Sequence, residues 1–182
     1  MNRLIFSIIH HFKYYFQMIN WMYVCAIFIL ISIAIQTIRI RKKLELKTIE
    51  IIISSLYFSM LLGFTILSRT PFSINNTKYT FLYTFINLKN EFSIYGILEI
   101  VFNILLFIPC GFILYHWNKS KWQVVLYTGI VSLLIEYMQL ILGLGTFEIC
   151  DLINNTLGGL IGVDILKGIN YLMRKIRCKN KE

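Results

Sequence analysis

Five long apolar stretches divide the chain, and each is long enough to cross a lipid bilayer as a helix. They lie near residues 19–38, 49–68, 97–116, 122–142 and 151–172. A transmembrane helix needs about 20 predominantly apolar residues, because the hydrocarbon core of a bilayer is about 30 Å thick. The pattern therefore predicts an all-α fold: a polytopic bundle of about five transmembrane helices that forms a single domain over residues 1–182.

Composition supports a membrane protein and argues against a nucleic-acid-binding one. Apolar residues make up 57% of the chain and charged residues 15%, and the mean hydropathy is +0.67. A soluble domain of this size has too few charges to cover so much apolar surface. The formal net charge is +9, but the Lys and Arg residues lie in short connections and in the tail. We therefore expect membrane lipids as partners, with anionic headgroups pairing with these cations, and no nucleic acid.

The distribution of cations predicts the topology, because cytoplasmic loops carry an excess of Lys and Arg. Three regions that alternate along the chain are rich in them. They are Arg39, Arg41, Lys42, Lys43 and Lys47 after the first span, Lys119 and Lys121 after the third, and Arg174, Lys175, Arg177, Lys179 and Lys181 in the tail. We expect the N-terminus outside and the C-terminus in the cytoplasm, in a bacterial cytoplasmic membrane.

Two segments outside the spans carry aromatic or polar patterns of their own. Residues 4–18 are interrupted by two His and one Lys and lack a cleavage site, so they predict an interfacial helix instead of a signal peptide. A short membrane-inserted segment is the alternative. In the outer connection, residues 79–85 place an aromatic side chain at every second position. This pattern predicts an aromatic belt on the bilayer surface, and a lid over the polar residues described next is the alternative.

Polar residues inside the spans are the candidates for chemistry. They are Asn103 in the third span, Glu136 and Gln139 in the fourth, and Asp151 and Asn155 in the fifth. At a rise of about 1.5 Å per residue, they lie between the outer ends of these spans and a depth of about 9 Å. Arg69, at the outer end of the second span, can reach toward them.

The spacing of these residues predicts a shared face and a shared use. Glu136 and Gln139 are three residues apart, and Asp151 and Asn155 are four apart, so each pair is adjacent on its helix. A carboxylate at the centre of a spanning helix costs about 3 kcal/mol on insertion scales, which favours a functional role. We predict that these residues and Arg69 bind a ligand in the outer leaflet. The alternative is that the amides only link helices by hydrogen bonds.

Other residues in the spans have structural explanations. Pro109 and Gly111 predict a kink in the third span, and Gly158 with Gly162 forms a GxxxG pair that is typical of close helix packing. The four cysteines form no CxxC pair, and no His or Cys lies at metal-ligand spacing from another. We therefore expect no disulfide framework, no metal site and no cofactor, while the sequence leaves the oligomeric state open.

Two stretches resemble the VanZ-like family. Residues 103–113, NILLFIPCGFI, are similar to its N-x-x-x-F-x-P-x-G span. Residues 136–162 resemble its second signature, an E-x-x-Q helix, a short turn and D-x-x-x-N-T-x-G-G-x-x-G. Together the motifs define a core over residues 97–165. Many members of the family carry an Arg in the turn after the Gln, where this chain has Gly145, so Arg69 becomes the candidate substitute.

The resemblance implies a class of function without naming a reaction. The family's namesake is associated with low-level resistance to teicoplanin, a glycopeptide that targets cell-wall precursors at the outer membrane surface. We expect a non-enzymatic protein that binds an amphiphile: a glycopeptide antibiotic, a wall-precursor lipid or a phospholipid. One alternative is an intramembrane enzyme acting on lipid headgroups with Glu136 as general base, although the sequence has no Ser–His pair and no HExxH motif. The other is a bundle that conducts ions or protons.

Overall fold

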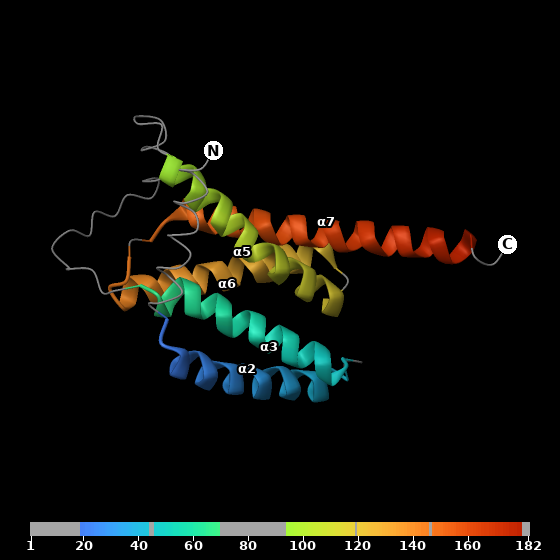
Figure 1. Ribbon diagram of the computed structural model, residues 1–182, viewed down its shortest axis with the longest axis horizontal. Coiled ribbons are helices and arrows are strands. Elements are labelled where there is room, and N and C mark those ends of the chain that lie inside the picture. Colours follow the sequence, from blue (N-terminus) through green and yellow to red (C-terminus); the bar gives the residue numbers. More distant parts are fainter. Residues whose placement is uncertain (1–18, 44–45, 70–93, 119, 146, 180–182) are drawn as a thin grey trace, which may run out of the picture. The chain divides into compact units, whose positions relative to one another are not determined.

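The computed structural model describes residues 19–43, 46–69, 94–118, 120–145 and 147–179 (Figure 1). Within them lie the helices α2 (Trp21–Lys42), α3 (Thr48–Leu62) with the short π-helix η1 (Gly63–Leu67) that continues it, α5 (Ile94–Asn118), α6 (Lys121–Ile141) and α7 (Ile149–Lys179).

The predicted all-α fold with five spans is confirmed. Five helices of the described chain are long and apolar enough to cross a membrane, and the described residues contain no strand. The predicted orientation of the termini stays a prediction. The predictions for residues 4–18 and 79–85 lie outside the described residues.

The helices pack as two compact units. Unit 1 comprises Met1–Lys78 and Tyr137–Thr146, and unit 2 comprises Tyr79–Glu136 and Phe147–Glu182. The boundary falls inside α6, so the greater part of this helix packs in unit 2 and its last turn belongs to unit 1. The single domain predicted from the sequence stays a prediction.

In unit 1, α2 and α3 lie side by side and run in opposite directions (Figure 1). The side chain of Asn20 accepts a hydrogen bond from the backbone N–H of Met22 at 3.1 Å and begins α2. Lys43, in the left-handed region with a φ of 50°, ends α2 by donating its N–H to the carbonyls of Arg39 and Ile40. These caps satisfy backbone groups that the ends of a helix otherwise leave without partners.

Small residues follow one another along a single face of α3 and the start of η1. Ser55, Ser59 and Gly63 are spaced four apart on one helix face, and all three are buried. The two hydroxyls donate to carbonyls of their own helix at 2.7 and 2.9 Å, so they are satisfied without water. A Cβ atom on Gly63 would stand 3.3 Å from Cγ2 of Val24 in α2. This is the small-residue packing that membrane helices use in place of hydrophobic burial, and the apolar pattern of the span alone does not predict it.

Unit 2 is built on a close contact between α5 and α7. A methyl group added to Gly158 would collide with the carbonyl oxygen of Ile104, and one added to Gly162 would collide with that of Ile108. In the same way, Gly111 on α5 faces the backbone of Gly159. Glycines at the crossing thus allow the two backbones to touch.

Pro109 lies within α5, which runs as one helix from Ile94 to Asn118. Its ring is on an exposed face, and proline has no N–H to donate to the carbonyl four residues earlier. The kink predicted there stays a prediction.

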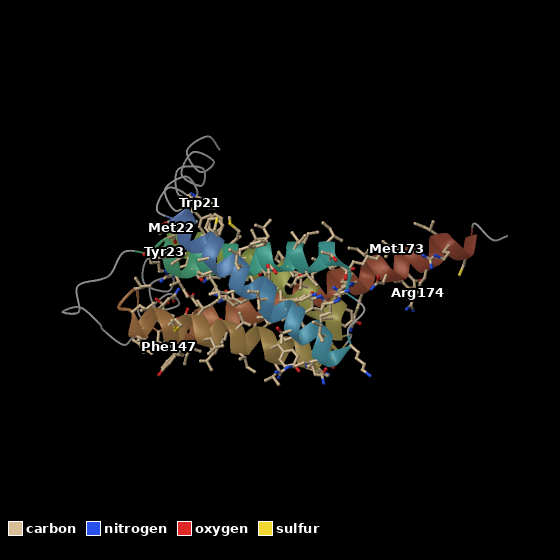
Figure 2. All side chains as sticks on the ribbon, turned by 90° about the horizontal axis from the view of Figure 1, so that it is seen from below. Trp21, Met22, Tyr23, Phe147, Met173 and Arg174 are labelled. Atoms are coloured by element: carbon tan, nitrogen blue, oxygen red, sulfur yellow. The ribbon has the colours of Figure 1, made fainter. Side chains whose placement is uncertain are left out.

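Helix α7 is longer than a bilayer requires. Its 31 residues correspond to about 46 Å, against about 30 Å for the hydrocarbon core. Figures 1 and 2 show its last turns, which carry Met173 and Arg174, extending past the end of α5. Residues 171–178 are all exposed. The helix therefore continues beyond the span as a basic extension.

Candidate functional site

Polar side chains, all of them buried except the partly buried Asn103, gather where the three helices of unit 2 meet. They are Asn103 on α5, Ser132 and Glu136 on α6, and Asp151, Asn154 and Asn155 on α7, here called the unit 2 cluster. Glu136 is 2% exposed and Asp151 is 6% exposed. Two carboxylates are therefore held out of water within helices that are apolar enough to span a membrane.

Asp151 and Asn103 link α7 to α5. The Nδ2 atom of Asn103 donates a hydrogen bond of 2.8 Å to Oδ1 of Asp151. Asp151 lies in the first turn of α7, where the helix dipole favours a negative charge. The glycine contact between the two helices brings these side chains within reach, because Asn103 precedes Ile104, the residue against which Gly158 packs.

Glu136 links the end of α6 to the start of α7. Its Oε2 atom accepts a hydrogen bond of 2.9 Å from the backbone N–H of Glu148, the residue directly before α7. The first N–H groups of a helix have no partner within the helix, and here a carboxylate from another helix supplies an acceptor near that end. Glu136 thus has a structural role in the turn between α6 and α7.

The two adjacent asparagines of α7 leave buried amide atoms without partners. Nδ2 of Asn155 donates to Oγ of Ser132 at 2.9 Å. Within the described residues, Oδ1 of Asn155 and Nδ2 of Asn154 have no hydrogen-bond partner. An unsatisfied buried polar group costs about 1–3 kcal/mol, so an acceptor and a donor remain available here for a ligand or for water.

Two members of the unit 2 cluster, Asn154 and Ser132, were not predicted from the sequence. Asn154 follows Asp151 by three residues and therefore lies on the same side of α7, which is the signal that identifies it. Ser132 precedes Glu136 by four residues and is completely buried. A lone Ser in an apolar helix gives no signal in the sequence, because its hydroxyl is ordinarily satisfied by its own backbone.

Gln139 and Arg69, which were also predicted to bind the ligand, belong to unit 1. Nε2 of Gln139 donates to the carbonyl oxygen of Thr65 at 2.8 Å. Arg69 lies against Gly145: a Cβ atom on this glycine would stand 2.9 Å from Nη1 of the arginine. Of the predicted residues, the structure joins Asn103 with Asp151, while Gln139 and Arg69 make these contacts within their own unit.

Charged and aromatic side chains pair at the far end of unit 2. Nζ of Lys121 lies 3.2 Å from Oδ1 of Asp164, and both side chains are partly exposed. Nζ of Lys167 lies 5.5 Å from the centroid of the Tyr115 ring, a distance typical of a cation–π contact. Among the residues described, no group of three His, Cys, Asp or Glu side chains could hold a metal ion.

Five apolar helices and a buried polar cluster among three of them define a multi-pass helical membrane protein. The chain belongs to the VanZ/LLP1 family, whose profile matches residues 5–172. This match confirms the resemblance seen in the two motifs and extends it over nearly the whole chain. No curated protein and no solved structure matches the chain.

Proposed function

We propose that this VanZ-family protein binds the polar head of an amphiphile at the unit 2 cluster. The proposal rests on two buried amide atoms of α7, Oδ1 of Asn155 and Nδ2 of Asn154. Among the described residues, neither atom has a hydrogen-bond partner, and α7 is long and apolar enough to span a membrane. Buried polar groups in proteins are nearly always hydrogen-bonded. A ligand that supplies a donor and an acceptor at this point would remove the cost of leaving both atoms unpaired.

The residues favour a head rich in hydroxyl, amide or amine groups. Asp151 and Glu136 are acceptors when ionised, and Asn155 adds a neutral acceptor beside the donor of Asn154. Sugars, peptides and amines offer the complementary donors, and sugars and peptides also offer acceptors. A glycopeptide antibiotic and a wall-precursor lipid both present these groups on an apolar anchor, and a phospholipid with an amine head presents a smaller set.

Family membership and helix composition together support a role at the cell envelope. The chain belongs to the VanZ/LLP1 family, and the namesake of the VanZ-like family is associated with low-level resistance to teicoplanin. Five described helices are long and apolar enough to cross a membrane. We propose a bacterial cytoplasmic membrane, with either glycopeptide tolerance or ordinary envelope maintenance as the physiological outcome.

Catalysis is the second candidate function, and the burial of Glu136 favours it. A carboxylate that is 2% exposed is shielded from bulk water, as the general base of an enzyme often is. Against this, Oε2 already accepts a hydrogen bond from the backbone of Glu148, so this oxygen holds the start of α7 in place. Conduction of ions or protons is less well supported, because Asp164, the next carboxylate along α7 after Asp151, is paired with Lys121.

Two isosteric variants test the proposal. Glu136→Gln and Asp151→Asn each remove a charge and keep the shape, so we expect both proteins to accumulate normally. We expect teicoplanin tolerance, measured as the minimal inhibitory concentration in a sensitive host, to fall to the level of cells without the protein. Asp164→Asn is the matched control, because this carboxylate belongs to the partly exposed pair with Lys121.

The products distinguish binding from catalysis. A binding protein reconstituted in nanodiscs should retain labelled teicoplanin or wall-precursor lipid saturably, at about one ligand per protein, and leave it chemically unchanged. An enzyme should produce a modified lipid, visible by mass spectrometry, that is absent with Glu136→Gln. Full tolerance and full retention in both charge variants at normal abundance would show that the cluster only holds the helices together.

A further inference from the structure

The second spanning segment ends in a wide turn that is closed by a side chain from α6. In η1 the backbone N–H of Ser68 donates to the carbonyl of Gly63, five residues earlier, at 2.9 Å, and that of Arg69 donates to Ile66 at 3.3 Å. The carbonyl of Thr65 instead accepts the Nε2 of Gln139 at 2.8 Å. Single π-turns of this kind occur frequently at functional sites. The turn fixes the backbone from which the Arg69 side chain extends.

The turn after α6 provides the surface on which Arg69 rests. Gly143 has a φ of 63°, a conformation that glycine adopts without strain, and the N–H of Leu144 donates to the carbonyl of Gln139 at 2.8 Å. Nη1 of Arg69 lies only 2.9 Å from the position that a Cβ atom on Gly145 would take. Any side chain at residue 145 would therefore displace the guanidinium, so this glycine sets its position.

Arg69 is a half-buried cation. Among the described residues, its guanidinium forms no hydrogen bond and no ion pair. The candidate span Thr48–Leu67 has 20 residues, or about 30 Å, and so fills the hydrocarbon core. Arg69 follows it by two residues and thus lies at the level of the lipid headgroups. The anions available at that level are phosphate diesters, and the planar fork of an arginine binds them with two parallel hydrogen bonds.

We propose that Arg69, held against Gly145, binds the phosphate group of a membrane lipid. This site lies wholly within unit 1. It uses none of the residues of the unit 2 cluster, so it can be tested independently of the amphiphile site proposed there.

The test is lipid retention by the full-length protein, purified in detergent and measured by native mass spectrometry. The probes are phosphatidylglycerol, a neutral diacyl glycolipid without phosphate, and inorganic phosphate. We expect wild-type protein to retain phosphatidylglycerol, and Arg69→Gln to lower this retention by about tenfold, the effect of losing hydrogen bonds to a charged group. Arg69→Lys keeps the positive charge but loses the planar guanidinium, so its lipid retention should lie between those of the wild type and Arg69→Gln. Arg41→Gln, at the exposed end of α2, is the matched charge control. It removes one of five cations that follow the first span, so it should lower retention by much less than tenfold.

Gly145→Ala tests the position of the guanidinium and not its charge. The added methyl would meet the far end of a flexible side chain, so thermal stability should change little while lipid retention falls. The same substitution in an Arg69→Gln background should have no further effect, since the methyl acts through the arginine. Gly168→Ala, where an added Cβ atom would meet nothing within 4 Å, is the control glycine.

Three results would overturn the proposal. The first is unchanged phosphatidylglycerol retention in Arg69→Gln protein that unfolds at the wild-type temperature. The second is equal retention of the phosphate-free glycolipid. The third is binding of inorganic phosphate without retention of the lipid, which would assign the site to free phosphate.

Discussion

The carboxylate of Asp151 accepts a 2.8 Å hydrogen bond from the side-chain amide of Asn103, across the contact between α7 and α5. Asp151 is only 6% exposed, so water cannot readily replace this donor. The bond is formed where glycines bring the two backbones into contact, which makes it sensitive to both the polar residues and the packing.

Removing the donor should cost more stability than neutralising the acceptor. Asn103→Ala deprives a buried carboxylate oxygen of its hydrogen bond, and we expect the free energy of unfolding to fall by about 1–3 kcal/mol. Asp151→Asn keeps an oxygen in the same place and should cost less than about 1 kcal/mol. Thermal unfolding of the purified proteins, followed by circular dichroism, measures both. Equal losses would contradict the importance of the shared hydrogen bond.

The glycines at the crossing of α5 and α7 should tolerate no larger side chain. Gly158→Leu and Gly162→Leu each place a side chain against a backbone carbonyl of α5, and overpacking of this kind costs about 1–3 kcal/mol or more. We expect both variants to lower the amount of folded protein in membranes. Gly168→Leu is the matched control, because the space around its Cβ position is open within 4 Å. If all three accumulate alike, the packing argument is wrong.

The polar pair of Ser132 and Asn155 should be dispensable for stability and necessary for binding. Asn155 has one amide atom without a partner in the described residues, so the pair does not satisfy its own hydrogen-bonding capacity. Replacing both partners with apolar residues can be neutral or stabilising. We expect Ser132→Ala with Asn155→Leu to unfold at or above the wild-type temperature and to lose ligand retention in nanodiscs. A stable double variant that still binds would remove Asn155 from the proposed site.

The ion pair between Lys121 and Asp164 should contribute little. Its side chains are 31% and 54% exposed, and pairs near a solvated surface contribute about 0.2–1 kcal/mol. A double-mutant cycle with Lys121→Met and Asp164→Asn should give a coupling energy below about 1 kcal/mol that decreases with added salt. A larger, salt-insensitive coupling would mean that the pair is buried in the membrane-embedded protein.

Two cysteine positions test the predicted orientation. The turn after α6 should face outward and the tail inward, because the tail is rich in cations. Leu142 is 47% exposed. A Leu142→Cys variant that has no other cysteine should react with a membrane-impermeant maleimide in intact cells. In a second variant, the exposed Cys178 is the single remaining cysteine and should react only after the cells are permeabilised. The reverse pattern would invert the topology.

The spans could be predicted from the sequence because a bilayer imposes one length and one polarity on every helix that crosses it. The end of α7 could not, since its apolar stretch stops near residue 172 while the helix continues to Lys179. Arg and Lys are good helix formers, so polarity ends the span without ending the helix.

The candidate site was predictable only in part. Asn103, Glu136 and Asn155 could be placed at similar depths by counting residues, but the partner of Gln139 could not be predicted. Its amide binds the Thr65 carbonyl, which is available because the backbone there winds as a π-helix. The sequence of this segment, GFTIL, does not predict a π-helix. The distribution of the predicted residues over two units follows from packing and not from helix depth.

The unbroken course of α7 has a mechanical consequence. One helix carries both the buried Asp151 and the exposed Arg177, and it crosses α5 at Gly159. From that crossing to Lys179 is about 30 Å of helix, so a tilt of about 10° at the crossing moves the basic end by about 5 Å. A rigid tilt of α7 about this crossing would therefore displace the basic end more than the buried carboxylate, and a spectroscopic label on the tail would measure that displacement.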